Sequence, residues 1–511
     1  MSITIIAENE HVGATLKAIE RKGALSHTIV HGVFVGPARS GKNSLMENLL
    51  GRIPSKFKSP STGIAEAVVQ VQVEKLTTVA ATIDKGSIWS VIDYNDEVIR
   101  LISIHSDSKN VQYEHQANPI YDPHITSSIP KIDSTPLKIL TQVIENKGLD
   151  ALQKYFETSW SLYLSNTGGQ IEFQEILPLL VSGPCVFFYT FRLDRDLNEH
   201  YTIEYELQDG TKSELYKSTL TTIEGIQQSL ASIAAMGIFV YQGREKKEVQ
   251  LQPKIFFVGT HRDLLPSNAA ESIIAEKDKY LQESTRQFVN IIEFASSSQM
   301  IFTVDNFCRD KSAFQKIRSA VERAVERHEF EMVCPSHWLI LSFALRRFEE
   351  EVVSYKECFE VAKQCGIVNK EELNDALRFI HTKMGLIRYF PHEYVKDVVV
   401  VKPQLLYDKI SELIVKTFTF DKAGKQSAEQ FIQKGIFSLD EFERICRKCG
   451  EGDMKASQFA KLLEKLRITA PLERDGDKVT KYFIPCILAH AAKAKEQIET
   501  LSSEIPPCTC D

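Results

Sequence analysis

A glycine-rich segment between a strand pattern and a helix pattern constrains this chain more than any other feature. The apolar run 28–35 predicts a buried strand, and the segment 44–50 predicts a short helix that ends at Gly51. Glycines let backbone N–H groups curl around phosphate oxygens, a lysine reaches the β- and γ-phosphates, and a helix N-terminus adds partial positive charge. The candidate phosphate contacts are Gly36, Pro37, Ala38, Arg39, Ser40, Gly41, Lys42, Asn43 and Ser44. A chance glycine-rich turn is the alternative, and the flanking strand and helix favour a phosphate-binding loop.

Apolar β-type runs alternate with helical patterns from about residue 26 to residue 330. The β-type runs lie at 28–35, 68–73, 160–165, 186–191, 255–258 and 301–304. The helical patterns lie at 44–50, 218–236, 269–289 and 312–330, and another begins near Glu172. Strands that alternate with helices predict an α/β fold with a mostly parallel sheet.

The residue after the lysine departs from the pattern of a magnesium-binding loop. Such a loop carries Ser or Thr at this position, and here the residue is Asn43. Ser44 does not replace it, because one step along a helix turns a side chain by about 100°. An amide oxygen can bind Mg²⁺, but the ion demands a tight octahedral shell. Asn43 is therefore a candidate metal ligand with altered chemistry.

A second element follows the predicted strand 160–165. It reads Asn166-Thr167-Gly168-Gly169-Gln170 and resembles the D-x-x-G-Q switch of small GTPases. In that interpretation the Gly169 N–H meets the γ-phosphate, and Gln170 is the catalytic residue that orients the attacking water. Asn166 stands where the switch has an aspartate that holds the Mg²⁺ shell. An ordinary turn is the alternative, and the preceding strand and phosphate loop favour the switch.

A threonine between these two elements is a candidate for the other switch. Thr62 lies in Ser59-Pro60-Ser61-Thr62-Gly63, and its hydroxyl and carbonyl could serve Mg²⁺ and the γ-phosphate. Many loops contain Ser and Thr, so a plain loop stays open as the alternative. The candidate metal ligands are Asn43, Thr62 and Asn166.

A third element ends the short apolar run 255–258. Thr260, His261 and Asp263 resemble the guanine-reading [NT]-K-x-D motif, with histidine where lysine is usual. A carboxylate at Asp263 can accept hydrogen bonds from the guanine N1–H and N2 amine, which adenine does not offer. An ordinary strand-end turn is the alternative, and the order and spacing of the elements favour the nucleotide. Val304-Asp305-Asn306 could take the place of the last base-contacting loop.

Taken together, these motifs and their order resemble the Roc GTPase domain of Roco proteins. The residues beyond Pro335 resemble the COR domain that follows Roc. The COR-like segments are Pro335-Ser336-His337-Trp338-Leu339, 373–381, Gly385-Leu386-Ile387-Arg388-Tyr389-Phe390 and 398–406 with Asp408.

The resemblance implies an arrangement of domains and a set of partners. A Ras-like domain would span residues 26–330, with an insertion at about 85–150. A mainly helical COR-like domain with a winged-helix part would span 335–490, and we expect 491–511 to be a frayed tail. The implied ligands are GTP/GDP and Mg²⁺, and the implied partner is a second copy bound through the COR-like region.

The sequence therefore predicts a guanine-nucleotide-binding signalling protein that hydrolyses GTP slowly or not at all, since two Mg²⁺ positions are amides. Two alternatives stay open. One is a pseudo-GTPase scaffold that acts through protein contacts. The other is a P-loop signalling ATPase, which would have no use for a carboxylate under the guanine edge.

Composition excludes several classes of partner. Lys plus Arg number 61 and Asp plus Glu number 68, so the formal net charge of −7 is unlike that of a nucleic-acid coat. The longest apolar stretch, 176–191, contains Pro178, Ser182, Gly183 and Pro184 and falls short of the ~20 residues of a membrane span. The first residues show no signal-peptide pattern. We expect a cytoplasmic protein without nucleic acid or an integral membrane span.

Overall fold

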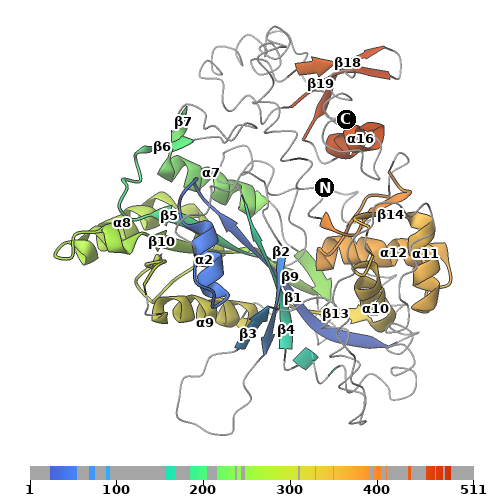
Figure 1. Ribbon diagram of the computed structural model, residues 1–511, viewed down its shortest axis with the longest axis horizontal. Helices are drawn as coiled ribbons and strands as arrows, with labels where there is room; N and C mark the ends of the chain where they lie inside the picture. Colours follow the sequence, from blue (N-terminus) through green and yellow to red (C-terminus); the bar gives the residue numbers. More distant parts are fainter. Residues whose placement is uncertain are drawn as a thin grey trace, which may run out of the picture.

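The computed structural model of the chain describes residues 23–54, 68–74, 88–91, 153, 156–157, 159–167, 185–203, 216–235, 239–242, 248–308, 311–327, 330–348, 350–391, 395–403, 410, 436–438, 456–465, 468–475 and 478–484. Within these ranges an α/β part lies beside a mainly helical part (Figure 1). One long strand, β1 (Ala24–Val35), extends from the first part into the second.

The α/β part is built on a nine-stranded sheet whose described path runs β11-β10-β5-β1-β4-β2-β3. Its strands besides β1 are β2 (Val68–Glu74), β3 (Ile88–Val91), β4 (Ser159–Asn166), β5 (Cys185–Arg192), β10 (Lys254–Thr260), β11 (Ile292–Glu293), β12 (Phe302–Thr303) and β13 (Glu331–Pro335). β1 runs parallel to β4 and β5, and β10 runs parallel to β5, β11 and β12. β2 and β3 form an antiparallel edge beyond β4. The predicted α/β fold with a mostly parallel sheet is confirmed.

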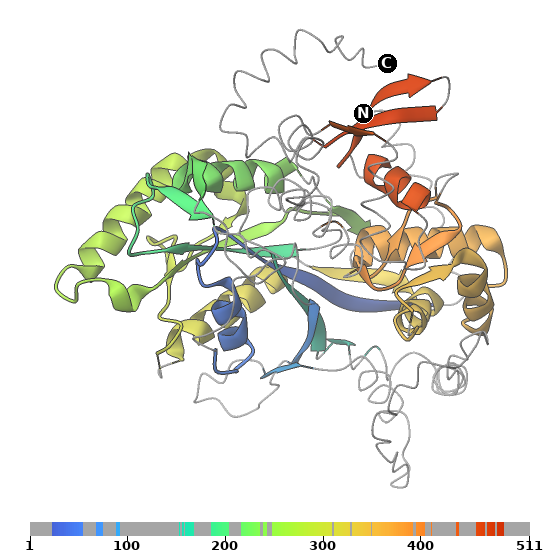
Figure 2. The same ribbon diagram turned by 45° about the horizontal axis from the view of Figure 1, so that its top comes forward.

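Helices cover both faces of this sheet (Figure 2). The helices are α2 (Lys42–Leu49), α7 (Thr222–Ala235), α8 (Ala270–Ser284) and α9 (Ser312–Arg327), with 3₁₀ turns η1 (Arg262–Leu264) and η2 (Arg286–Ile291). Buried side chains of α2 and α9 share one core with Val30 and Phe34 of β1. Buried side chains of α7 and α8 share the other core with Val33 and Val35. Alternate residues of β1 therefore serve opposite layers, as the pleat of a strand requires.

Two antiparallel hairpins lie between the sheet strands, and one of them corrects a predicted helix. The hairpins are β6 (His200–Ile203) with β7 (Tyr216–Thr221), and β8 (Phe239–Gln242) with β9 (Glu248–Leu251).

The helical pattern at 218–236 starts only at Thr222, because Thr221 and Glu224 form a capping box with N–H···O distances of 2.8 and 3.3 Å. The helix predicted at 269–289 likewise ends at Ser284, where the chain tightens into η2.

The helical part has the order of a winged helix, as the sequence predicted. Its elements are α10 (Ser336–Leu345), β14 (Val352–Ser354), α11 (Tyr355–Gln364), α12 (Lys370–Phe379), the π-helical turn η3 (Ile380–Met384), β15 (Arg388–Tyr389) and β16 (Val398–Val400). The three strands form an antiparallel sheet in the order β14-β16-β15. Every residue of α10 is buried, so this helix is the centre of the part.

A second small sheet follows along the chain. It contains β17 (Ile436–Ser438), β18 (Ala470–Asp475) and β19 (Lys478–Phe483), and α16 (Ala456–Lys465) precedes β18. No helix in the described ranges combines the length and apolar character that crossing a membrane requires.

β1 joins the two main parts. Its first residues, 24–28, pair antiparallel with β13, which leads directly into α10. Farther along β1, the His31 Nε2 atom lies 2.7 Å from the Met384 carbonyl oxygen of η3. On the neighbouring strand β4, the Tyr163 hydroxyl accepts a hydrogen bond at 2.7 Å from Arg346, which follows α10 and lies over the Tyr163 ring. One continuous core therefore runs from α2 and α9 into α10, α11 and α12.

Candidate functional site

The phosphate loop begins where β1 ends and finishes at the N-terminus of α2. Two of its glycines are required by the backbone. Gly36 has φ +132°, and a Cβ atom there would lie 2.1 Å from the Thr190 carbonyl oxygen. Gly41 has φ +88°, and a Cβ atom there would lie 2.6 Å from the Asn306 Nδ2 atom. Any other residue at these positions would push the loop away from β5 and from the loop after β12.

The lysine of the loop is buried and fixed by the loop itself. The Lys42 Nζ atom donates to the carbonyl oxygens of Gly36 and Pro37, each at 2.9 Å. These two contacts hold the ammonium group against the first residues of the phosphate loop. The first N–H groups of α2 have no acceptor within their own helix. The loop can therefore present a cation and several N–H donors to one anion.

Two buried hydroxyls attach the loop to the neighbouring strands. The Ser40 and Thr190 hydroxyl oxygens lie 2.5 Å apart, which ties the loop to β5. The Thr260 hydroxyl, at the end of β10, lies 2.7 Å from the Ser40 carbonyl oxygen and 3.1 Å from that of Phe191. Side chains of β5 and β10 thus hold the loop that begins where β1 ends.

The predicted base-reading residues follow Thr260 at the same edge of the sheet. His261 adopts a left-handed conformation with φ +58°, and its Nδ1 atom lies 2.9 Å from the Thr260 hydroxyl. Burial lowers the pKa of His261 and the charge of Arg192 lowers it further, against three carboxylates that raise it. The imidazole is therefore neutral at pH 7. Asp263 is exposed, as a carboxylate that meets a ligand should be.

A polar chain connects α2 to Asn306, in the segment after β12 that the sequence offered as the last base-contacting loop. The Asn48 Nδ2 atom donates to the Asn306 carbonyl oxygen at 2.9 Å, and Lys311 Nζ lies 2.5 Å from Asn48 Oδ1. Asn306 Nδ2 lies 3.4 Å from the Gly41 carbonyl oxygen, and Asn306 Oδ1 is buried without a hydrogen-bond partner. The sequence indicated Asn306 but not Asn48, whose signal is that it is a polar residue on the apolar face of a short helix.

The predicted metal positions are only partly within the described residues. Asn43 lies in the first turn of α2. Asn166 ends β4, is fully buried and pairs in register with Phe34 of β1. Ser44 lies one residue farther inside α2. Thr62, Gly169 and Gln170 lie outside the described residues. In the described ranges, no three His, Cys, Asp or Glu side chains group as metal ligands.

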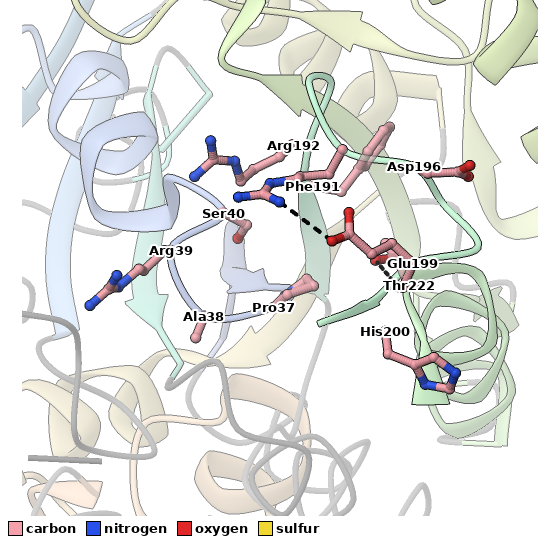
Figure 3. A pocket seen from close by; sticks show the side chains of 11 residues that line it. Pro37, Ala38, Arg39, Ser40, Phe191, Arg192, Asp196, Glu199, His200 and Thr222 are labelled. Carbon is pink, nitrogen blue, oxygen red and sulfur yellow. Dashed lines mark hydrogen bonds and ion pairs between the residues drawn. The ribbon is translucent and has the colours of Figure 1, made fainter. Parts of the chain in front are cut away.

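A cavity of about 220 Å³ adjoins the phosphate loop (Figure 3). Pro37, Ala38, Arg39 and Ser40 line one side of it. The remaining lining comes from the end of β5 and the chain after it, namely Phe191, Arg192, Arg195, Asp196, Glu199, His200 and Thr222. The phosphate loop therefore borders this partly polar cavity as well as the base-reading residues.

Comparison with known proteins gives one family match. Residues 335–488 match the family described as C-terminal of Roc, COR-A domain. No curated protein matches the sequence. The solved structure of Methanosarcina barkeri Roco2 RocCORdC bound to GDP is 12% identical, covers 91% of this chain and 98% of its own, and has a TM-score of 0.48. The signal recognition particle receptor SRb-GTP/SRX complex from Chaetomium thermophilum is 10% identical, covers 57% of this chain and 98% of its own, and has a TM-score of 0.24.

Proposed function

We propose that this chain, whose residues 335–488 match the COR-A family, is a Roco-like protein whose α/β part binds guanine nucleotides. One observation carries the proposal. The Thr260 hydroxyl joins the phosphate loop to the base-reading residues at a single edge of the sheet. A nucleotide needs both sites at once, with phosphates at one and base at the other. In open α/β sheets, this carboxyl edge is where ligands bind.

The phosphate end of the site is suited to a diphosphate or triphosphate. Lys42 supplies a point charge whose position two carbonyl oxygens already fix. Backbone N–H groups at the start of α2 supply neutral donors, and α2 adds the positive end of its dipole. Because the loop is held by Ser40 and Thr260, little ordering remains to be done when the ligand binds.

The base end of the site is suited to guanine. Asp263 is exposed and can accept from the N1–H and N2 amine of the base. A neutral His261 offers a flat ring beside it rather than a charged stem. Adenine has no donor pair in this position, so it would leave the carboxylate without partners. The exposed Asp263 carboxylate therefore favours a guanine-nucleotide-binding protein over a signalling ATPase.

Mg²⁺ fits this site less well than the nucleotide does. The ligands from the chain would be Asn43, Thr62 and Asn166, two of them amides. The ion, when bound, neutralises charge on the phosphates. Fully buried Asn166 presents a neutral amide where a carboxylate would balance that charge. We therefore propose weak Mg²⁺ dependence and slow GTP hydrolysis, with Gly169 and Gln170 in the switch roles. If the chain did not hydrolyse GTP at all, it would be a pseudo-GTPase scaffold that acts through protein contacts.

We further propose that the COR-A domain mediates a homodimer. Analytical ultracentrifugation of the full chain with GDP, and with a non-hydrolysable GTP analogue, would measure it. A monomer at high concentration under both nucleotides would contradict the dimer. The full chain is the sample to use, because removal of β13 takes a pairing strand away from β1.

Selectivity among nucleotides tests the proposed function. The purified full chain is stripped of ligand, mixed with equal amounts of GDP, GTP, ADP and ATP, desalted, and measured by native mass spectrometry. We expect one guanine nucleotide per chain and no adenine nucleotide. Lys42→Ala serves as the binding-deficient control. Comparable retention of ADP or ATP would contradict guanine recognition.

A further inference from the structure

The base-reading loop lacks a cation at the position where its motif has lysine. His261 occupies that position, and the lowered pKa keeps its ring neutral at pH 7. The three carboxylates whose charges act on His261 are those of Asp194, Asp263 and Asp305. An exposed Asp263 beside two other acids would be a poor place for a phosphorylated ligand unless a positive charge were close by.

We propose that Arg192, from the neighbouring strand β5, supplies the cation that the base-reading loop lacks and thereby contributes to guanine nucleotide binding. This inference rests on the proposed function. Arg192 would be a specificity-determining residue that offers N–H donors to oxygens of the bound nucleotide. It would do so from beside the position of the missing lysine.

Strand register places Arg192 next to the loop. Arg192 is paired with Thr260 in the parallel ladder between β5 and β10. The following residue continues the contact, since the Leu193 N–H donates to the Thr260 carbonyl oxygen at 3.0 Å. Arg192 is therefore the β5 residue directly across from the start of the base-reading loop. It also lines the 220 Å³ cavity together with Ser40 of the phosphate loop (Figure 3).

Asp194, two residues beyond Arg192 along the chain, fixes the orientation of the guanidinium. Arg192 Nε and Nη2 donate to the two carboxylate oxygens of Asp194 at 2.9 and 2.6 Å. A bidentate pair of this kind holds the guanidinium plane more firmly than a single contact does. It takes up two of the five N–H donors, and no described residue accepts from the other three.

The charge of Arg192 reaches the base-reading residues. The hydrogen bond that Arg192 donates to Asp194 raises the pKa of Arg192 most, and the charges of Asp194 and Asp263 raise it further. Its side chain is 27% exposed, so the guanidinium is accessible from solvent. A planar, permanently charged group that is already oriented loses little freedom when it binds oxygen acceptors.

Arg195 offers a matched comparison. It lines the same cavity, carries the same charge and makes an ion pair with Glu199 at 3.4 Å. However, it lies beyond the end of β5 and has no ladder partner in β10 within the described strands. An effect of local positive charge alone would make the two arginines equivalent, whereas the proposed role belongs to Arg192.

The test uses calorimetric titration of GDP into the full chain. Arg192→Ala is expected to weaken GDP binding by about tenfold, the size of one lost cationic contact. Arg192→Gln keeps a donor for Asp194 but loses the charge, and it should weaken binding equally, which provides a second variant if Arg192→Ala does not fold. Arg195→Ala should stay within about twofold of the wild type.

A rescue experiment separates ligand binding from a structural role. The double variant Arg192→Ala with His261→Lys returns the cation to its usual position and should recover most of the lost affinity. Wild-type affinity in Arg192→Ala and Arg192→Gln would overturn the inference. A loss that His261→Lys does not rescue would also overturn it, because Arg192 would then act only through the fold. Failure of the wild type to bind GDP would instead refute the proposed function.

Discussion

At its C-terminal end β1 leads into the loop that we propose binds phosphates, whereas its N-terminal half is packed against the COR-A domain. We call residues 36–43 with Thr260–Asp263 the nucleotide end, and His27, His31, Tyr163, Arg346 and Met384 the COR end. At the nucleotide end Arg39 and Asp263 are exposed. At the COR end, by contrast, His27 is buried and the His31 ring contacts a backbone carbonyl of η3.

This difference teaches that one strand can separate ligand binding from domain packing. Changes at the nucleotide end should alter affinity and leave the free energy of unfolding almost unchanged. Changes at the COR end should do the reverse, unless the two ends are coupled through β1. Coupling between them would appear as a change in both quantities for a single substitution.

The largest expected effect is at the COR end and depends on pH. Burial lowers the pKa of His27 to about 3, of His31 to about 4 and of His381 in η3 to about 3. Arg388 lowers the last two further, while the Met384 carbonyl opposes this at His31. These histidines take up protons near pH 6.5 only when unfolded. Stability is therefore full above pH 6.5 and falls as the pH drops toward 4, by up to about 1.4 kcal/mol per pH unit for each histidine.

Urea unfolding at pH 7.5, 6.5, 5.5 and 4.5 measures this slope. His31→Phe keeps a ring in the core and removes one titrating group, so it should reduce the slope by about a third. Equal stability of the wild type at pH 7.5 and 4.5 would contradict the lowered pKa values of these three histidines.

The next effect is at the nucleotide end. Lys42→Ala removes the cation that the loop fixes over its own curve, and we expect GTP affinity to fall by about two orders of magnitude. The unfolding midpoint of the ligand-free chain should shift little by comparison. Wild-type affinity in this variant would show that the loop is structural. The nucleotide end would then not differ from the COR end in the way proposed here.

A smaller effect concerns the metal positions. Asn43→Ser with Asn166→Asp replaces both amides by the groups that a Mg²⁺ site uses, and single-turnover GTP cleavage should rise by about tenfold or more with Mg²⁺. Chelation of the metal should abolish the gain. A wild type as fast as the double variant would refute the proposed slow hydrolysis.

The smallest effect tests the hydroxyl that joins the two halves of the nucleotide end. Thr260→Val removes the contact to Ser40, and GDP affinity should fall by about fivefold, the value of one hydrogen bond. Thr285 is a matched control, because its buried hydroxyl also donates to a backbone carbonyl at 2.7 Å, in α8. Thr285→Val should lose similar stability and no affinity. Equal losses of affinity in both would remove Thr260 from the site.

Local patterns in the sequence predicted the nucleotide end more fully than the COR end. The phosphate loop, its strand and its helix are contiguous, so one motif with its flanks contains their whole geometry. Pairing of residues 24–28 with β13 joins segments about 300 residues apart, and no local period encodes such a pairing. For this reason the strand predicted at 28–35 begins at Ala24 in the structure.

Side-chain contacts between segments distant in the chain could not be predicted from the sequence for the same reason. Thr190, Asn48 and Arg192 are ordinary residues in their own segments, and they acquire roles only through register and packing. The capping box of Thr221 and Glu224 is, by contrast, encoded locally as a T-x-x-E pattern, although the helix predicted at 218–236 did not use it.

The specificity of Asp263→Asn for the base tests the central claim most directly. Xanthine carries a carbonyl oxygen where guanine carries its N2 amine, and an asparagine amide can donate to that oxygen while accepting from N1–H. Calorimetry of GDP and xanthosine diphosphate with wild type and variant should show a reversal of preference, GDP for the wild type and xanthosine diphosphate for Asp263→Asn. The exposed pair of Arg262 with Glu271 supplies the control, since Glu271→Gln should leave both affinities unchanged. Unchanged preference in Asp263→Asn would contradict guanine recognition by this loop.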